Sequence, residues 1–428
     1  MRYILSLIGI LGIYSYHHAQ TITISEINYR SNATRDAGDW FEIYNYGSTP
    51  AILDGLTITD SSGIIYTIPS GTTLNAGSFL VLVSDIAKFI AEYPTVSNYI
   101  GPLGFALSKT SDMIRINNGA ITLTQVSYTN EFPWPRCSNG RGRTWENIDI
   151  SNAILLSTAT RWKDGCMGGS PGTAYMDCND NIVFSEINYN SDSLLNQGEF
   201  IELHNRTDAA INLTGYALRD SRDTITNIWY FPSGTMLPAY GYLAVSNDLV
   251  AINTIHSGIT NVIGTLPFSL DNSGEAIRLF NASGRLIYSI VYDDTLSWPI
   301  TPDGEGYTLE LVNETGNVNI GSSYIAGCLG GSPGVVYSLP CVPLSIEDQS
   351  SIIAINPNPA NDLIYITKLN NEKYDYELLS IEGKSIMHGY LDINNNAIAV
   401  NNLSTGIYFI LLHKTNDESS LHKIFVKK

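Results

Sequence analysis

The order of apolar and polar residues along this chain follows the short periods of β-strands. Thr21–Ile24 alternates polar and apolar residues, and Phe79–Val83 is a continuous apolar run, which is typical of a strand buried on both faces. Met113–Ile116 and Ile121–Val126 flank an Asn-Asn-Gly turn, which predicts a β-hairpin. Only Asp85–Tyr93 looks helical, and it stops before a proline. Strand signals at short intervals, with no helices interleaved, predict an all-β chain of sandwiches.

The same pattern occurs twice along the chain. Ser25–Tyr29 reads Ser-Glu-Ile-Asn-Tyr and returns as Ser185–Tyr189, and the predicted hairpin returns within Ile277–Val291. Each copy closes with Gly-Gly-Ser-Pro-Gly, at Gly168–Gly172 and Gly330–Gly334. Such a period indicates tandem duplication of one structural unit. We therefore predict two β-sandwiches followed by a smaller third one, with domains over residues 20–178, 179–342 and 345–428.

Residues 1–19 have the features of a signal peptide. Arg2 supplies the positive start, Ile4–Ile13 is apolar but too short to span a bilayer, and Ala19 offers a small residue for cleavage. We expect this segment to direct export and to be removed. No other segment reaches 18 uninterrupted apolar residues, so we expect no transmembrane span in the mature protein.

The charge of the chain narrows the classes of partner. Its formal net charge is −18, which repels nucleic acid and anionic membrane surfaces, because binding to either depends on Lys and Arg. Charged residues make up 15% and hydrophobic residues 44%, which suits a globular, β-rich extracellular protein. Nucleic acid is therefore a disfavoured partner, and the acidic surface is interpreted as a solubilising field.

The repeated blocks resemble the lamin tail domain. Ser-Glu-Ile-Asn-Tyr is followed by Trp-Phe-Glu-Ile-Tyr-Asn at Trp40–Asn45 and by Gly-Leu-Thr-Ile-Thr-Asp at Gly55–Asp60, before the closing Gly-Gly-Ser-Pro-Gly. The resemblance covers residues 21–175 and 182–337. It implies two tandem immunoglobulin-like β-sandwiches, found also in secreted bacterial proteins. It further implies a binding or scaffolding role, with nucleic-acid, protein and lipid contacts proposed for various members, and no catalysis.

The last 80 or so residues are similar to the type A sorting domain of the type IX secretion system of the Bacteroidetes. The similarity rests on Asn356–Ala360, Ser380–Lys384, Leu403–Phe409 and Lys423–Lys428, although Asn356 stands where an aromatic residue is common. It implies the type IX secretion machinery as a partner, passage across the outer membrane, and then attachment to surface lipopolysaccharide or release. The residues that carry the motif are Pro357, Pro359, Gly383, Gly406, Tyr408 and Lys423.

All five cysteines lie after the predicted signal peptide. Cys166 and Cys328 are repeat equivalents, and each has a second cysteine shortly after it. We predict the local disulfides Cys166–Cys178 and Cys328–Cys341, since an exported chain meets an oxidising compartment. Cys137 has no repeat equivalent, and the pairing Cys137–Cys166 stays open, because sequence does not determine connectivity. The spacing does not indicate a metal site, and no cofactor is predicted.

Four glutamates recur inside the repeated apolar strands, and they admit two interpretations. A close pair of carboxylates would serve as acid and base or hold a metal. The favoured interpretation is structural, in which each accepts backbone N–H bonds at a turn or sheet edge, as a partly buried charge must. No HExxH, nucleophile-elbow or Walker motif accompanies them, so no catalytic residue is predicted. The four are Glu26, Glu42, Glu186 and Glu202.

Two loop regions offer alternatives. Arg219–Asp223 and Asp293-Asp294 carry oxygen ligands suited to Ca²⁺ but lack EF-hand spacing, and solvated loops are the favoured interpretation. The second region has three arginines between two tryptophans, a combination that can grip anions or stack on bases. The second repeat keeps the Trp-Pro and the glycines but lacks the arginines, so this candidate ligand contact belongs to the first repeat alone. Its residues are Trp134, Arg136, Arg141, Arg143 and Trp145.

We predict from this pattern a secreted or surface-anchored protein that binds an extracellular protein or glycan and catalyses no reaction. A metal-assisted extracellular hydrolase of the phosphoesterase type is the first alternative, and it would have to use loop aspartates. An anion-binding or nucleic-acid-binding module acting through the arginines is the second. The residues of the hydrolase alternative are Asp220, Asp223, Asp293 and Asp294.

Overall fold

The computed structural model describes residues 21–427, except 193–194, 223, 296, 315–317, 338–353, 368–372, 382, 393–394 and 415–418. The predicted signal peptide, Cys341 and Asp223 therefore lie outside the described residues. The chain forms two compact units, Met1–Leu344 and Ser345–Lys428. The first unit contains both repeats, called here module 1 (residues 21–178) and module 2 (residues 179–337).

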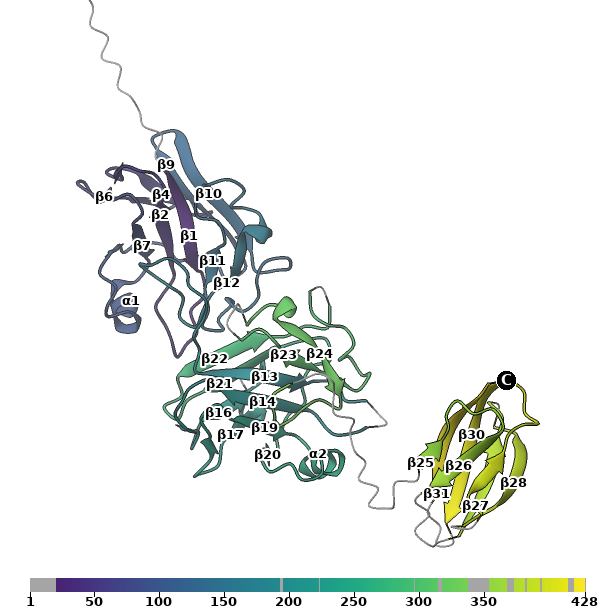
Figure 1. Ribbon diagram of the computed structural model, residues 1–428. Coiled ribbons are helices and arrows are strands. Elements are labelled where there is room, and N and C mark those ends of the chain that lie inside the picture. Colours follow the sequence, from purple (N-terminus) through teal and green to yellow (C-terminus); the bar gives the residue numbers. More distant parts are fainter. Residues whose placement is uncertain are drawn as a thin grey trace, which may run out of the picture. The chain divides into compact units, whose positions relative to one another are not determined.

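Module 1 is a β-sandwich with a six-stranded sheet ordered β12-β11-β1-β2-β7-β8 and a four-stranded sheet ordered β10-β9-β4-β5 (Figure 1). All seven residues of β1 are buried, because this strand runs through the middle of the larger sheet. The strands are β1 Ile22–Asn28, β2 Trp40–Asn45, β3 Ala51–Ile52, β4 Thr57–Thr59, β5 Ile65–Thr67, β6 Thr73–Leu74, β7 Phe79–Val83, β8 Tyr99–Ile100, β9 Ser111–Asn118, β10 Ile121–Thr129, β11 Trp145–Asn147 and β12 Trp162–Asp164. The helices are α1 Ile86–Glu92 and the 3-10 turn Ala159–Arg161.

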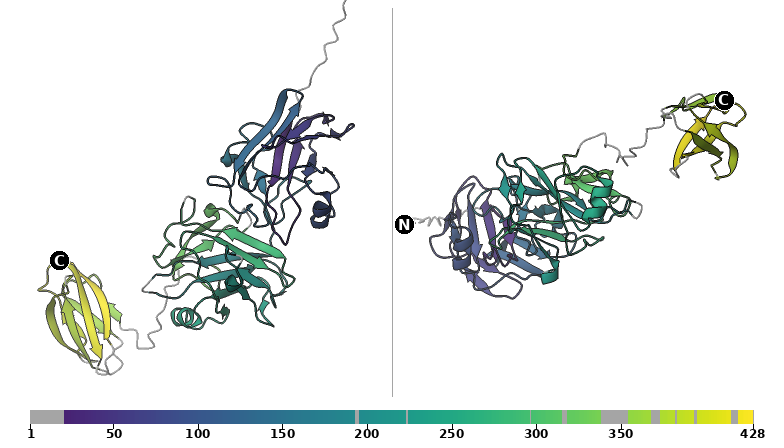
Figure 2. Two further views of the ribbon diagram at one scale, coloured as in Figure 1. Left: turned by 180° about the vertical axis from the view of Figure 1, so that it is seen from behind. Right: turned by 90° about the horizontal axis from the view of Figure 1, so that it is seen from below.

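Module 2 repeats this topology, with sheets ordered β24-β23-β13-β14-β19-β20 and β17-β16-β21-β22. The two sandwiches have separate apolar cores and can be followed in both views of Figure 2. The strands are β13 Ile182–Asn188, β14 Phe200–Asn205, β15 Ile211–Asn212, β16 Ala217–Arg219, β17 Ile228–Tyr230, β18 Met236–Leu237, β19 Tyr242–Ser246, β20 Val262–Gly264, β21 Ala276–Phe280, β22 Leu286–Val291, β23 Tyr307–Leu311 and β24 Tyr324–Leu329. The helices are α2 Leu249–Ile255 and the 3-10 turns Ile225–Asn227 and Gly321–Ser323.

Helix α2 corrects the expectation that only residues 85–93 would be helical. It follows strand β19 in module 2, just as α1 follows strand β7 in module 1. The side chain of Asp248 accepts hydrogen bonds from the backbone N–H groups of Val250 and Ala251, and Ile252 is buried. The helix therefore forms through capping and tertiary burial, although several of its residues are β-branched and poor helix formers.

The second unit is a smaller sandwich with its own core, formed by a three-stranded sheet β25-β26-β29 and a four-stranded sheet β28-β27-β30-β31. Its fold agrees with the prediction for the C-terminal region. The strands are β25 Ala354–Asn356, β26 Leu363–Thr367, β27 Tyr374–Leu379, β28 Ser385–Leu391, β29 Ala397–Ala399, β30 Gly406–Lys414 and β31 Ser419–Val426.

Module 1 covers the edge strand of the smaller sheet of module 2. Strand β22 pairs with β21 on one side only, which leaves backbone groups on its other side without a strand partner. Side chains of module 1 bond these groups: Thr34 Oγ1 accepts from Leu286 N at 2.8 Å, and Arg143 donates to the Ser289 carbonyl from Nε and Nη2 at 3.1 and 2.9 Å. This contact, called here the junction, holds the two modules together and brings their loops into one site.

Candidate functional site

Three glutamates face one another across neighbouring strands at the centre of the larger sheet of module 1. Glu26 of β1 pairs in register with Glu42 of β2 on one side and with Glu146 of β11 on the other. All three are buried. Like charges opposite one another in a sheet are unfavourable, so the sandwich holds this group only by neutralising or bonding the carboxyl groups.

The closing Gly-Gly-Ser-Pro-Gly loop supplies the partners of this group. Ser170 donates its backbone N–H to Glu26 Oε1 at 3.0 Å and its hydroxyl to Glu146 Oε1 at 2.7 Å. Gly172 donates its backbone N–H to Glu42 Oε2 at 2.5 Å. The sequence-based interpretation as acceptors of backbone N–H groups therefore agrees with these contacts, but the carboxyl groups lie at the centre of the sheet and not at its edge.

Burial shifts the proton affinities of these groups upwards. Desolvation is the largest cause in each case, and it raises the pKa of Glu42 to about 8 and that of Glu146 to about 7. The pKa of Glu26 is raised well above its usual value, by burial first and then by the charges of Glu146 and Glu42. The group therefore holds protons at neutral pH, which is how like carboxyls coexist in a dry interior.

Module 2 contains the same arrangement, with Glu186 in register with Glu202 and Glu310. Its loop residue Ser332 donates its backbone N–H to Glu186 at 3.0 Å and its hydroxyl to Glu310 at 2.6 Å. The sequence analysis found four of the six carboxyls and missed Glu146 and Glu310. A signal was present, because both follow a threonine by two residues at equivalent repeat positions. Since all six are buried, we interpret them as anchors of the closing loops.

The two tryptophans of the predicted Trp–Arg contact belong to the core of module 1. Trp134 and Trp145 are buried and tilted against each other with ring centroids 4.9 Å apart. The indole N–H of Trp145 donates to the carbonyl of Pro135 at 3.0 Å. Neither ring is available as a stacking surface for a ligand.

The three arginines that lie between these tryptophans in the sequence have three different surroundings. Arg143 is 1% exposed; it bonds Ser289 across the junction and the Gly165 carbonyl within module 1 at 3.0 Å. Arg136 forms an ion pair with Asp293 of module 2. Arg141 lines a cleft between the modules. The five predicted residues therefore do not form one exposed surface, and Arg141 is the member placed at a cleft.

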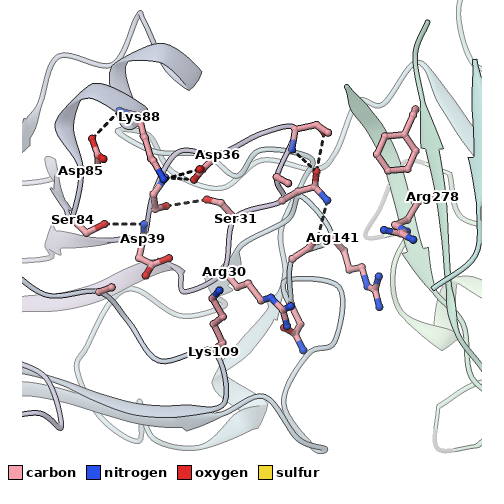
Figure 3. Close-up of a pocket in the computed structure, with 18 of the residues that line it drawn as sticks. Arg30, Ser31, Asp36, Asp39, Ser84, Asp85, Lys88, Lys109, Arg141 and Arg278 are labelled. Atoms are coloured by element: carbon pink, nitrogen blue, oxygen red, sulfur yellow. Dashed lines mark hydrogen bonds and ion pairs between the residues drawn. The ribbon is translucent and has the colours of Figure 1, made fainter. Parts of the chain in front are cut away.

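This cleft has a volume of about 1020 Å³ and is lined by loops of module 1 and by strands β16 and β21 of module 2 (Figure 3). Six of its lining residues are basic and three are acidic, whereas the whole chain is strongly acidic. The charge inside the cleft is thus opposite in sign to that of the protein. The basic residues are Arg30, Lys88, Lys109, Arg141, Arg219 and Arg278, and the acidic residues are Asp36, Asp39 and Asp85.

The aspartates lie on the module 1 side of the cleft, as Figure 3 shows. Asp36 pairs with the ammonium group of Lys88 at 2.7 Å, and this hydrogen bond lowers the pKa of Asp36. Asp39 accepts the backbone N–H of Leu107 at 3.0 Å, and its burial raises its pKa to about 6. Asp85 accepts the backbone N–H of Lys88 at the start of α1. This wall offers carboxylate oxygens in fixed positions.

The opposite wall consists of arginines and an aromatic ring. The guanidinium of Arg219 lies 4.3 Å from the ring centroid of Phe280, and its Nε is buried with no hydrogen-bond partner among the described residues. Arg278 is buried and donates from Nε to the Asp220 carbonyl at 3.0 Å. On the module 1 side, Arg30 donates to the Asn139 side chain at 2.8 Å. Figure 3 shows Arg30 and Arg141 between the aspartates and Arg278.

Two residues of the hydrolase alternative, Asp220 and Asp293, are bonded to other side chains of module 2 or of the junction. Asp220 is fully buried and accepts hydrogen bonds from Arg222 and Asn227, and Asp293 is paired with Arg136 and Thr295. Among the described residues, no three His, Cys, Asp or Glu side chains are grouped so as to hold a metal ion. His204 is a strand residue, stacked on Tyr242 and 2.6 Å from Glu314.

One of the two predicted disulfides is present among the described residues. The disulfide Cys166–Cys178 forms as predicted, which leaves the rival partner Cys137 as a buried free thiol at the junction, where Val291 N donates to its sulfur at 3.2 Å. The second predicted pair involves Cys341, which lies outside the described residues, so Cys328–Cys341 stays a prediction.

The residues of the sorting motif are spread over the second unit. Pro357 and Pro359 follow β25, Gly383 joins β27 to β28, Gly406 and Tyr408 begin β30, and Lys423 lies on β31 opposite Phe409.

Comparison with known families identifies the repeats. The Lamin Tail Domain model matches residues 16–130 and 178–294, which together are more than half of the chain. A Secretion system C-terminal sorting domain model matches residues 354–427. This sorting domain indicates export by the type IX secretion system to the cell surface or the extracellular space. No helix among the described residues has the length and apolar character needed to cross a membrane.

A search of curated proteins found no match. Among solved structures, a DUF4876 family protein from Bacteroides thetaiotaomicron is similar at 10% identity and a TM-score of 0.23, over 71% of this chain and 96% of that one. The BSP domain of a biofilm associated protein matches at 8% identity and a TM-score of 0.16, over 95% and 81%. Latent PorU from Porphyromonas gingivalis matches at 10% identity and a TM-score of 0.14, over 95% and 34%. TM-scores this low support no functional argument.

Proposed function

Because the chain belongs to the lamin tail domain family and carries a type IX sorting domain, we propose that it is an extracellular or surface-displayed binding protein without catalytic activity. Its binding site is the cleft between the modules, and its ligand is an extracellular glycan or protein. The observation that carries this proposal is the cleft itself, in which charged and polar side chains from both modules converge on one volume.

The chemistry of the cleft favours binding over catalysis. Binding sites use a few fixed polar groups around a preformed hollow, and here the junction holds both walls in place. Catalysis by acid and base in this cleft would need a carboxyl group that touches the substrate there, yet the six glutamates with raised pKa values do not line it and are bonded by the closing loops. Asp39 is the lining carboxyl with a raised pKa, and its Oδ2 accepts the backbone N–H of Leu107.

The proposal is tested by filling the cleft. Ala106 lines it and is exposed, so Ala106→Trp should occupy the volume without disturbing the core. Ala209→Trp is the matched control, since Ala209 is exposed in module 2 and does not line the cleft. The full chain is screened on arrays of glycans and extracellular proteins, and each captured ligand is retested with both variants. We expect Ala106→Trp to lose capture and Ala209→Trp to keep it.

Two results would contradict the proposal. Capture that is equal for the parent and Ala106→Trp would remove the cleft as the binding site. Turnover of phosphoester or glycoside substrates by the full chain, lost in Asp→Asn variants of Asp293 or Asp294, would replace binding by the hydrolase alternative.

A further inference from the structure

The two walls of the cleft have different chemistry. The module 1 side presents the carboxylates of Asp36, Asp39 and Asp85 together with basic side chains, which are Lys88, Lys109, Arg30 and Arg141 (Figure 3). The module 2 side presents the guanidinium group of Arg219, which lies over Phe280, and it has no acidic lining residue. A ligand that satisfies the cleft must therefore carry hydrogen-bond donors for the carboxylates as well as negative charge for the guanidinium groups.

Resting on the function proposed above, we propose that the cleft binds an acidic saccharide, a sugar chain that bears carboxylate or sulfate groups. Its hydroxyl groups donate to the aspartate wall, and its anionic group lies against Arg30, Arg141 and Arg219. Arginine is the residue best suited to that role, because its planar donors match a carboxylate or sulfate in two-point hydrogen bonds. The ring of Phe280 lies under the guanidinium of Arg219 and supports it from below.

The charge distribution favours this ligand over a nucleic acid. A nucleic acid presents a long row of phosphates and binds along an extended basic groove, usually with aromatic stacking platforms. Here the basic residues are gathered within one cleft of a chain whose net charge is −18, and aspartates share the same volume. Those aspartates accept hydrogen bonds from sugar hydroxyls, which a ligand made only of anionic groups does not offer.

The size of the cleft is also that of an organic ligand. Ligand-binding hollows in proteins span a few hundred to about 1,000 Å³, which places this cleft at the upper end of the range. A single inorganic anion would contact only one wall. A saccharide of more than one residue reaches both walls, so a sugar chain suits the cleft better than a free anion.

The test measures binding to the full chain by isothermal titration calorimetry at low and at physiological salt. The probes are oligogalacturonate as the carboxylate form, heparin-derived oligosaccharide as the sulfated form, neutral cello-oligosaccharide, poly-glutamate peptide and single-stranded DNA. The cleft variant is Arg30→Gln with Arg141→Gln. The charge-matched control is Arg115→Gln with Arg206→Gln, which removes the same charge from residues that do not line the cleft.

We expect one or both acidic oligosaccharides to bind the parent, with the cleft variant weakened by about tenfold or more and the control by about twofold or less. The two acidic probes then tell whether carboxylate or sulfate is the preferred group. Circular dichroism melting curves confirm that both variants are folded. Ala106→Trp should abolish the same binding.

Each other outcome overturns the inference in a distinguishable way. Equal binding of neutral and acidic saccharides would remove the acidic requirement and leave the proposed binding function standing. Binding of DNA or poly-glutamate alone, weakened in the cleft variant, would assign the cleft to a different polymer. Absence of binding by either acidic probe at about 1 mM and low salt would reject an acidic saccharide as ligand, and the array screen then decides separately whether the cleft binds anything.

Discussion

Gly169 meets Glu26 at a point where a side chain does not fit. Its φ of +73° already favours glycine, and a Cβ built there would lie 2.1 Å from Glu26 Oε1. Gly331 repeats the contact in module 2, where the distance to Glu186 Oε1 would be 2.0 Å. The second glycine of each closing motif is thus explained by the buried carboxyl group, which the loop must approach closely in order to bond it.

Replacing Gly169 should therefore destabilise module 1 by more than the backbone conformation alone. We expect Gly169→Ala to lower the free energy of unfolding by about 3 kcal/mol, combining left-handed strain with overpacking. Gly71→Ala is the matched control, because Gly71 has a φ of +83° and no atom within 4 Å of its Cβ position, and it should cost only about 1 kcal/mol. Equal losses in urea unfolding would contradict the close contact with Glu26.

The buried carboxyls also make stability depend on pH. Their pKa values are raised on folding, so the folded state binds more protons than the unfolded state between the unfolded value near 4.5 and the folded values of about 7 to 8. Stability is thus fully present below that window and is lost as pH rises through it.

We expect the free energy of unfolding to fall between about pH 5 and pH 8, by about 1.4 kcal/mol per pH unit for each proton released. Glu42→Gln keeps the hydrogen-bonding shape without titrating, so it should flatten part of this slope. Urea unfolding at a series of pH values measures both. A slope unchanged by Glu42→Gln would show that the proton is held elsewhere.

At the scale of elements, contacts with the edge strand β22 account for two residues of module 1, Arg143 and Cys137, that module 2 lacks. Arg143 stands where the repeat has Tyr307, and its guanidinium bonds the Ser289 carbonyl of β22. An edge strand with open backbone groups invites pairing with another chain, and module 1 occupies this one. Cys137, which the sequence left without a repeat equivalent, lies at the same strand.

Loss of Arg143 should open the junction and expose Cys137. Arg143→Ala leaves the buried Ser289 carbonyl without these two bonds, which costs about 1–3 kcal/mol. We expect the Cys137 thiol to be alkylated faster than in the parent chain. Mass spectrometry of the peptide that contains Cys137 measures this rate. Arg115→Ala, which removes a bond to Gln125 within module 1, is the control and should leave the rate unchanged. Alkylation that stays slow in Arg143→Ala would mean that the junction does not depend on this residue.

At the scale of the whole molecule, the sorting domain and the pair of modules are separate compact units. Residues 345–428 form a compact unit with an apolar core of its own, distinct from the cores of the two modules. The proposed binding site therefore lies in the first unit, and the sorting domain that indicates export is the second.

Deletion of residues 345–428 should abolish surface display in a host with a type IX secretion system. We expect the truncated chain to stay inside the outer membrane, while its melting transition matches that of the modules in the full chain. Cell fractionation and surface protease accessibility measure the first effect, and calorimetry the second. Restoring the domain should restore display. Display that persists without it would contradict the assignment.

Much of the fold was predictable because strand periodicity, turn residues and repetition are local properties of a chain. The duplicated sandwich follows from such patterns, and the disulfide Cys166–Cys178 follows from the spacing of the cysteines in the repeat. The sorting domain was predicted from its resemblance to a known family, which the family match confirms. Helix α2 was not predicted, because its residues favour strands locally and only burial and the Asp248 cap make it a helix.

The sequence by itself determined the kind of protein, since apolar periodicity and motif order specify strands, repeats and an export signal. Only the tertiary structure decided which side chains meet. The strand order brought Glu146 beside Glu26, and the junction separated Arg143, Arg136 and Arg141 into a buried bond, an ion pair and a cleft wall. Spacing along a chain does not say which strands become neighbours or which edge is covered, and those choices are what create the cleft.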